Sequence, residues 1–94
     1  MTVLFAPEAE AELHELVEYL AERNPQAAAE LGERILSVIE QLAEGVFEGA
    51  EQSLISGEVV RSWAVPPVRI YYKRELRSLW VVRIYHQARR PITR

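Results

Sequence analysis

Cationic and titratable side chains gather in the C-terminal half of the 94-residue sequence. Arg61, Arg69 and Arg83 are permanent cations, and their guanidinium groups suit the recognition of an anionic group. His86 belongs to the residue type that changes charge near neutral pH, so it can serve as a general acid or base. This combination favours an anionic partner that is bound, or acted on, by this half of the chain. The competing interpretation of His86 is a hydrogen-bonded structural histidine near a strand end.

Three strand-like segments carry these residues, and they begin at Val59, Val68 and Ser78. Side chains alternate between the two faces of a strand. In the second segment Ile70 and Tyr72 point to one face. Arg69, Tyr71 and Lys73 point to the other face, which is therefore cationic and aromatic. In the third segment the alternation separates Trp80, Val82 and Ile84 from Leu79, Val81, Arg83 and Tyr85. Because the third segment is apolar on both faces, we expect it to be the central strand.

The N-terminal half predicts a scaffold of one short strand, over residues 2–6, and two helices. Pro7 suits the first position of a helix that ends at Asn24, and a second helix runs from Pro25 to its stop at Gly45. Apolar residues recur at helical spacing in both: Leu13, Leu16, Val17 and Leu20, then Ala28, Leu31, Ile35, Val38, Ile39 and Leu42. The short connection predicts an antiparallel helical hairpin.

Two features of this half raise separate questions. Residues 46–57 contain glycine and show no clear period, so we expect a connecting loop. Gly32 lies inside the second helix, where glycine costs about 1 kcal/mol relative to alanine. A close approach of the first helix is the expected compensation.

Charge is divided unequally along the chain. Residues 1–51 hold 12 glutamates against Arg23 and Arg34, a balance of −10. Residues 52–94 hold nine lysines and arginines against Glu58 and Glu75, a balance of +7, which gives a net charge of −3 for the whole chain. This asymmetry indicates an anionic partner for the basic half. The alternative is that acidic helices and a basic sheet attract one another within one domain.

Length and composition limit the architecture to a single domain, residues 1–94, with one core. The expected fold is α+β in the order βααβββ, with the helical hairpin packed on one face of a small, mainly antiparallel sheet. The sequence has no cysteine and only two histidines, so we expect neither a metal site nor a cofactor. No apolar run is long enough for a membrane span and no signal peptide is evident, so we expect a cytoplasmic protein.

The order of these elements and two motifs resemble the RelE/ParE superfamily of bacterial toxins from type II toxin–antitoxin modules. The motifs are Arg-Ile-Tyr-Tyr at residues 69–72 and Arg-Ile-Tyr-His-Gln-Ala-Arg-Arg-Pro at residues 83–91. The resemblance covers nearly the whole chain, and the second motif is closer to the ParE branch. The acidic helical half also fits that branch better than a nuclease that must approach RNA.

The ParE resemblance implies a toxin of the plasmid-stabilisation type that inhibits DNA gyrase by protein contact. It also implies a cognate antitoxin that neutralises the toxin and forms a hetero-oligomer with it. The surface expected to bind these partners comprises Arg61, Arg69, Tyr71, Lys73, Arg83, Tyr85, Arg89 and Arg90.

The RelE branch implies a different activity, the cleavage of mRNA on the ribosome. Under that alternative Arg61, Arg69 and His86 are the expected catalytic residues, although Gln87 stands where some nuclease members have a tyrosine. A third alternative is an inactive family member that only binds an antitoxin.

Overall fold

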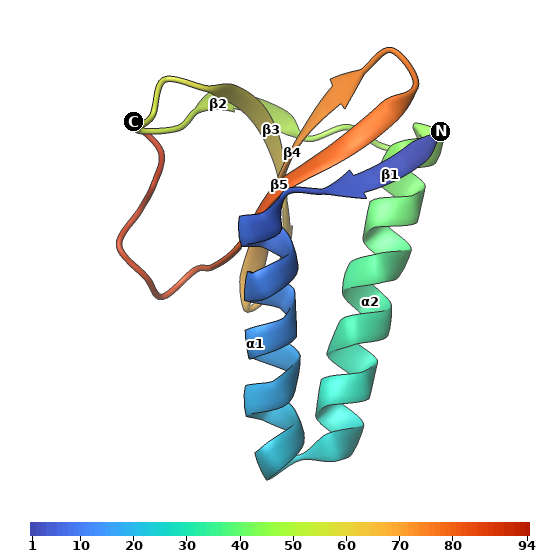
Figure 1. Cartoon of the computed structure of the whole chain (residues 1–94), viewed down its shortest axis with the longest axis vertical. Helices are drawn as coiled ribbons and strands as arrows, with labels where there is room; N and C mark the ends of the chain where they lie inside the picture. The colour runs from blue at the N-terminus through green and yellow to red at the C-terminus, as the bar shows by residue number, and fades with distance from the viewer.

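Two helices cover one face of a five-stranded sheet in the computed structural model, which describes all 94 residues (Figure 1). The elements in chain order are β1 (Thr2–Phe5), α1 (Pro7–Arg23), α2 (Pro25–Glu44), β2 (Ala50–Ser53), β3 (Val59–Val65), β4 (Val68–Glu75) and β5 (Ser78–His86). The strands lie in the order β1-β5-β4-β3-β2, with β1 parallel to β5 and every other pair antiparallel. The expected α+β class and helical hairpin are thus confirmed.

Two expectations about the sheet are wrong. Residues 50–53 form the strand β2 instead of lying in a loop, so the order of elements is βααββββ. This short strand pairs with β3 at the outer edge of the sheet and is mostly exposed, so its sequence shows no alternation of apolar and polar residues. The middle position of the sheet belongs to β4, and β5 lies between β1 and β4.

A β-bulge in β5 changes the predicted faces of that strand. The register shifts between Tyr71 and Tyr72 of β4, because Tyr71 pairs with Arg83 whereas Tyr72 pairs with Val81. Val82 is therefore the extra residue, and Ile84 turns to the helix side, where it joins the main core. The prediction that groups Ile84 with Trp80 and Val82 is wrong, because a strict two-residue period does not allow for an inserted residue.

The helix boundaries follow from their end residues, as expected. Pro7 and Pro25 begin the helices, at positions where a missing N–H breaks no intrahelical bond. Asn24 caps α2, since its side-chain oxygen accepts a hydrogen bond from the Ala27 N–H at 3.1 Å. Gly45 ends α2 with φ at 77°, a left-handed conformation that glycine adopts without strain. Neither helix is long and apolar enough to cross a membrane.

The main core lies between α2 and the helix-facing side of β4 and β5. Its most deeply buried side chains include Ile35, Ile39, Leu42, Ile70, Tyr72, Leu79 and Val81. α1 contributes only Ala9 as a fully buried residue, and Leu13, Leu16 and Leu20 are partly covered. Figure 1 shows that both helices extend beyond the sheet. Part of the apolar stripe of α1 therefore stays open to solvent.

A polar network fixes the connection between α2 and β2. The Tyr72 hydroxyl donates to Glu48 Oε1 at 2.8 Å and accepts from the Gly49 N–H at 2.7 Å. Arg74 Nη2 donates to the same carboxylate oxygen at 3.0 Å and to the Leu42 carbonyl at 2.7 Å. Because Tyr72 and Leu42 belong to the main core, these bonds join the end of α2 to β4.

Gly32 and Gly49 predict opposite mutational effects. A Cβ added at Gly32 would lie 3.8 Å from Val17 Cγ2, an ordinary contact, so the expected close approach of α1 does not require glycine. Gly32→Ala should raise the free energy of unfolding by about 0.5–1 kcal/mol. A Cβ at Gly49 would lie 2.0 Å from the Ser62 carbonyl oxygen, so Gly49→Ala should lower it by about 1–3 kcal/mol. Urea denaturation measures both; a destabilised Gly32→Ala would contradict this packing.

Acid should weaken the polar network. The hydrogen bond from Arg74 holds the pKa of Glu48 below its usual value of 4.5, and the bond from Tyr72 acts in the same direction. This contribution to stability should therefore be complete above a pH of about 4.5 and disappear as the pH falls through the pKa of folded Glu48. Urea denaturation of wild type and Glu48→Gln at several pH values should show a stability gap that narrows on acidification. Glu44→Gln, at an exposed position near the same end of α2, is the control that removes one carboxylate outside this network.

Candidate functional site

The sheet face opposite the helices is partly covered by residues 87–94, here called the C-terminal strap. The strap leaves β5, bows outward and returns to the edge of the sheet beside β2 (Figure 1). There the Ile55 N–H donates to the Ile92 carbonyl at 2.6 Å, and the Arg94 N–H donates to the Ser53 carbonyl at 3.0 Å. Ile92 also packs on a small second core made of Leu54, Val60 and Tyr71. The strap is therefore a bonded part of the fold.

A cationic hollow of about 150 Å³ opens between the strap and the ends of β4 and β5. Its lining residues are Arg69, Tyr71, Tyr85, His86, Gln87, Arg89 and Pro91. No carboxylate lines this hollow, although the chain carries 14 acidic residues. Arg69 and Tyr85 are paired across β4 and β5, which explains why residues far apart in sequence meet here. The hollow is thus a place where a negatively charged group can be held.

The side chains around the cationic hollow are oriented by hydrogen bonds. Arg69 Nη1 donates to Ser62 Oγ at 3.0 Å, and Ser62 Oγ donates to Gln52 Oε1 at 2.6 Å. The Tyr85 hydroxyl donates to the Arg90 carbonyl, which links β5 to the strap. His86 Nδ1 accepts from the Ala88 N–H at 3.1 Å, so the proton of the neutral ring lies on Nε2.

Tyr71 forms the floor of the cationic hollow and is only 6% exposed. Burial raises the pKa of Tyr71 above its usual value of 10.0, and the nearby charge of Arg69 opposes this shift. Tyr71 therefore stays protonated near neutral pH. It supplies a neutral surface beneath the arginines.

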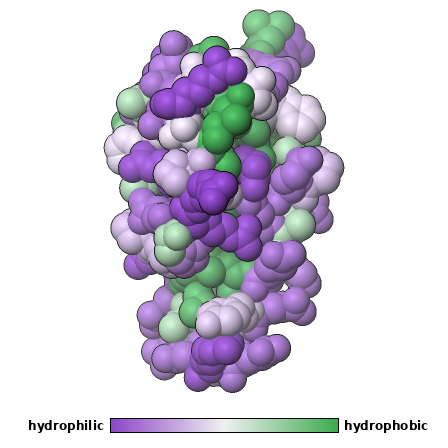
Figure 2. Space-filling view, turned by 90° about the vertical axis from the view of Figure 1, so that its left-hand side faces the viewer, coloured by the Kyte–Doolittle hydropathy of each residue, from purple (hydrophilic) through white to green (hydrophobic).

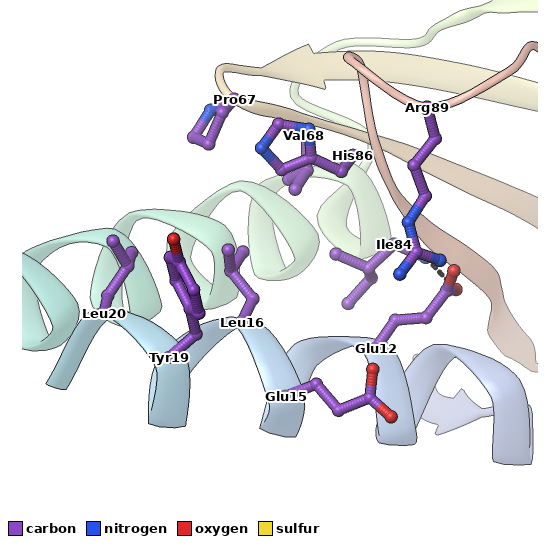
Figure 3. Close-up of a pocket in the computed structure, with 10 residues that line it drawn as sticks. All are labelled: Glu12, Glu15, Leu16, Tyr19, Leu20, Pro67, Val68, Ile84, His86 and Arg89. Atoms are coloured by element: carbon purple, nitrogen blue, oxygen red, sulfur yellow. Dashed lines mark hydrogen bonds between the residues drawn. The ribbon is translucent and has the colours of Figure 1, made fainter. Parts of the chain in front are cut away.

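An apolar groove of about 380 Å³ lies next to the cationic hollow, between α1 and the end of the sheet. Its lining residues are Glu12, Glu15, Leu16, Tyr19, Leu20, Pro67, Val68, Ile84, His86 and Arg89 (Figure 3). Figure 2 shows this side of the molecule, where green apolar surface is recessed between purple polar and charged side chains. His86 and Arg89 line both the groove and the hollow, so the two depressions form one continuous surface.

Glu12 connects α1 to the exposed edge of β5. β1 pairs with β5 only as far as Val81, so the Ile84 N–H has no strand partner on that side. The Glu12 carboxylate accepts this N–H at 3.1 Å and also binds the Arg83 guanidinium through two bonds, of 2.9 and 2.8 Å. These bonds to Glu12 raise the pKa of Arg83 above its usual value. One carboxylate thus satisfies both a backbone donor and a cation.

The structure brings together five of the residues predicted for the site: Arg69, Tyr71, Tyr85, His86 and Arg89. Arg61 lies apart, since it follows the alternation of Trp63 and Val65 toward the helix side and donates to the Gly49 carbonyl at 2.8 Å. Lys73 lies in another depression and pairs with Glu58 at 2.7 Å, which raises the pKa of Lys73. Arg83 forms an ion pair with Glu12.

The remaining predicted residue, Arg90, is exposed beside the cationic hollow and reaches the site only through its backbone carbonyl. Glu12, Leu16 and Leu20 line the groove although the sequence predicts only a scaffold role for the helix that carries them. The i, i+4 spacing of Leu16 and Leu20 was the only available signal. No group of three or more histidine, aspartate or glutamate side chains gathers to hold a metal ion.

The chain shares its small α+β fold with a solved toxin–antitoxin structure. A solved structure described as the chromosomal ParDE TA system from P. aeruginosa matches with a TM-score of 0.70 and 17% sequence identity. The match covers 92% of this chain and 95% of that chain. At this identity the likeness shows a shared fold. None of the curated proteins matches.

A family model identifies the chain more closely. The model described as the ParE toxin of type II toxin-antitoxin system, parDE, matches residues 3–91. The chain belongs to this ParE toxin family. The superfamily resemblance drawn from the two motifs, and the preference for the ParE branch, are therefore confirmed.

Loss of the Glu12 carboxylate should destabilise the fold. Glu12→Ala leaves the Ile84 N–H and the partly buried Arg83 guanidinium without their acceptor, which should lower the free energy of unfolding by about 1–3 kcal/mol. Glu15→Ala, one turn away and exposed, is the matched control and should change stability by less than about 0.5 kcal/mol. Thermal and urea denaturation provide the measurement. Equal stability of the two variants would show that Glu12 does not hold β5.

Proposed function

We propose that this chain is a toxin that inhibits DNA gyrase by protein contact in the cytoplasm, and that a cognate antitoxin neutralises it. The observation that carries the proposal is the match of the ParE toxin family over residues 3–91. The similar structure comes from a ParDE toxin–antitoxin system, which supports an antitoxin as a partner. A module of the plasmid-stabilisation type would pair these two proteins.

The placement of the candidate catalytic residues supports binding over RNA cleavage. A nuclease must bring its cations and its acid or base to the same phosphate. Arg61 is turned to the helix side and bonded to Gly49, whereas Arg69 lies on the opposite face of the sheet. His86 therefore shares its hollow with only one of the two arginines predicted for catalysis.

The surface charge supports the same conclusion. Of the glutamates on α1 and α2, only Glu12 forms an ion pair with a cation of the sheet. Direct ion pairing between helices and sheet is thus confined to Glu12 and Arg83, and the remaining helical carboxylates give the hairpin an acidic surface. Such a surface repels the polyanionic backbone of RNA. Binding to a protein requires no such approach.

Ribosome-dependent cleavage of mRNA is the second candidate, because Arg69, His86 and Arg89 do share one hollow. These residues offer a histidine and two cations to one anionic group. An inactive family member that only binds its antitoxin is the third. The three candidates differ in what the purified toxin does to gyrase, to mRNA and to growth.

Paired activity assays separate these candidates. Purified toxin should inhibit DNA supercoiling by gyrase and leave mRNA intact in a translating extract, because its predicted catalytic set is dispersed. His86→Ala should abolish cleavage under the nuclease alternative, whereas under the proposed function it should only weaken gyrase inhibition. Codon-specific cleavage with normal supercoiling would overturn the proposal. Expression without growth arrest would indicate the inactive form.

A further inference from the structure

We propose that His86 is a pH-sensitive latch for the C-terminal strap: the neutral imidazole stabilises the turn at which the strap begins, and protonation of the imidazole releases that turn. The contact that forms the latch is the hydrogen bond in which His86 Nδ1 accepts from the Ala88 N–H at 3.1 Å. The latch acts on the shape of the chain itself and involves no partner. It therefore goes beyond the proposed function.

Three hydrogen bonds form the turn at which the strap leaves β5. The Gln87 N–H donates to the Pro67 carbonyl at 2.9 Å, and the Arg89 N–H donates to the His86 carbonyl at 3.1 Å. Both of these bonds join backbone groups, which do not titrate near neutral pH. The bond from the Ala88 N–H has a titratable acceptor instead. It is the part of the turn that responds to protonation.

Protonation turns the acceptor of this bond into a donor. A neutral imidazole has one donor nitrogen and one acceptor nitrogen, whereas both nitrogens of an imidazolium are donors. In protonated His86 the Nδ1–H faces the Ala88 N–H, and two donors do not bond to each other. Histidine side chains change charge between about pH 5 and pH 8. That interval lies above the range in which the Glu48 network weakens, because the hydrogen bond from Arg74 holds the pKa of Glu48 below 4.5.

The charges of the cationic hollow oppose a protonated His86. Arg69 of β4 and Arg89 of the strap line the hollow together with His86, and neither arginine has a carboxylate oxygen within 4.0 Å. The other titratable residues of the hollow are Tyr71 and Tyr85, and phenol groups stay uncharged in this pH interval. A third cation is repelled by the first two. Repulsion and the lost hydrogen bond thus act in the same direction.

The helices offer little compensation on the other side of His86. Three titratable residues of α1 line the apolar groove with it: Glu12, Glu15 and Tyr19. Glu12 already binds Arg83, and Glu15 lies on the opposite side of the groove (Figure 3). From α2, Arg34 adds a cation at the β3–β4 turn, where it donates to the Pro66 carbonyl at 2.8 Å. No carboxylate oxygen lies within 4.0 Å of His86 to stabilise its charged form in the closed turn.

Release of the turn frees the near end of the strap and leaves its far end attached. The far end keeps its backbone bonds to Ser53 and Ile55. Pro91, which lines the cationic hollow, lies between the two attachments. Acidification should therefore widen the hollow from the side of the strap and uncover Tyr71, the floor of the hollow, which is only 6% exposed when the turn is closed.

The test is an NMR titration of the full chain from about pH 8 to about pH 5. Imidazole nitrogen shifts report the tautomer and the charge of His86. Hydrogen exchange of the Ala88 amide, corrected for its intrinsic pH dependence, reports opening of the turn. The protection of this amide should fall by about threefold to tenfold as His86 becomes protonated, since one hydrogen bond is lost. The amides of α2 and β4 should keep their protection throughout.

Three variants separate the latch from other effects. His86→Asn is the matched variant, because an asparagine oxygen can accept the N–H two residues on, as in an Asx turn, and does not titrate. Its Ala88 amide should stay protected at both ends of the titration. His86→Ala removes the acceptor, so the amide should show the low protection of the acidic state at every pH. His14→Asn removes the exposed histidine of α1 and should respond like wild type.

Four results would overturn the inference. The first is constant protection of the Ala88 amide while His86 titrates, and the second is the same loss of protection in His86→Asn. The third is a rise in protection on acidification that Glu15→Gln abolishes, which would show that the imidazolium closes the strap across the groove. The fourth is a parallel loss of protection in α2 and β4, which would show global unfolding. Because neither gyrase nor an antitoxin is present, each outcome is independent of the proposed function.

Discussion

The early end of β1 is the constraint on which the functional face depends. β1 accompanies β5 only to Val81, and the chain turns into α1 directly afterwards. The remaining edge of β5 would expose an unpaired backbone donor, a costly arrangement beside a helix. Glu12 resolves this by accepting from Ile84 and from Arg83 at once. That carboxylate, together with the apolar residues that α1 packs on the core, holds α1 against the end of the sheet and so maintains the groove between them.

The bulge at Val82 acts together with this contact. By inserting one residue, it turns Ile84 into the core and leaves Arg83 and Tyr85 on the open face. Tyr85 then meets Arg69 across the strand pair and reaches the strap through its hydroxyl. Without the extra residue, the alternation would direct Ile84 away from the core. The geometry of the hollow therefore depends on one irregularity in an otherwise regular sheet.

The scaffold could be predicted from the sequence, because its signals are local. Proline at the helix starts, Asn24 as a cap and Gly45 as a stop all act through their immediate neighbours. The strands β3, β4 and β5 could be predicted because apolar residues dominate them. β2 could not be predicted, since an exposed edge strand buries too little surface to require alternating apolar and polar residues.

The candidate site could be predicted only in part, because its parts meet through long-range contacts. Arg69, Tyr71, Tyr85 and His86 share strands or motifs, so sequence reasoning brought them together. It could not show that Arg61 turns toward the helices, or that Arg83 is neutralised by a residue 71 positions away. Charge counted over half a chain does not distinguish cations that are paired inside the fold from those that remain free. The cationic hollow is lined by two cations that remain free, Arg69 and Arg89.

The weak attachment of the strap also affects the cationic hollow. Residues 92–94 are held to the edge of β2 by a few backbone bonds and one partly buried isoleucine, far less than holds the helices to the sheet. Local opening at this end should therefore occur at a much lower free energy than global unfolding. When residues 92–94 open, Pro91 moves with them, whereas Arg69 and Tyr71 stay on β4 and the Arg89 N–H stays bonded to the His86 carbonyl. The hollow then loses one wall and keeps both arginines, so the local stability of the strap governs the shape of the hollow more than its charge.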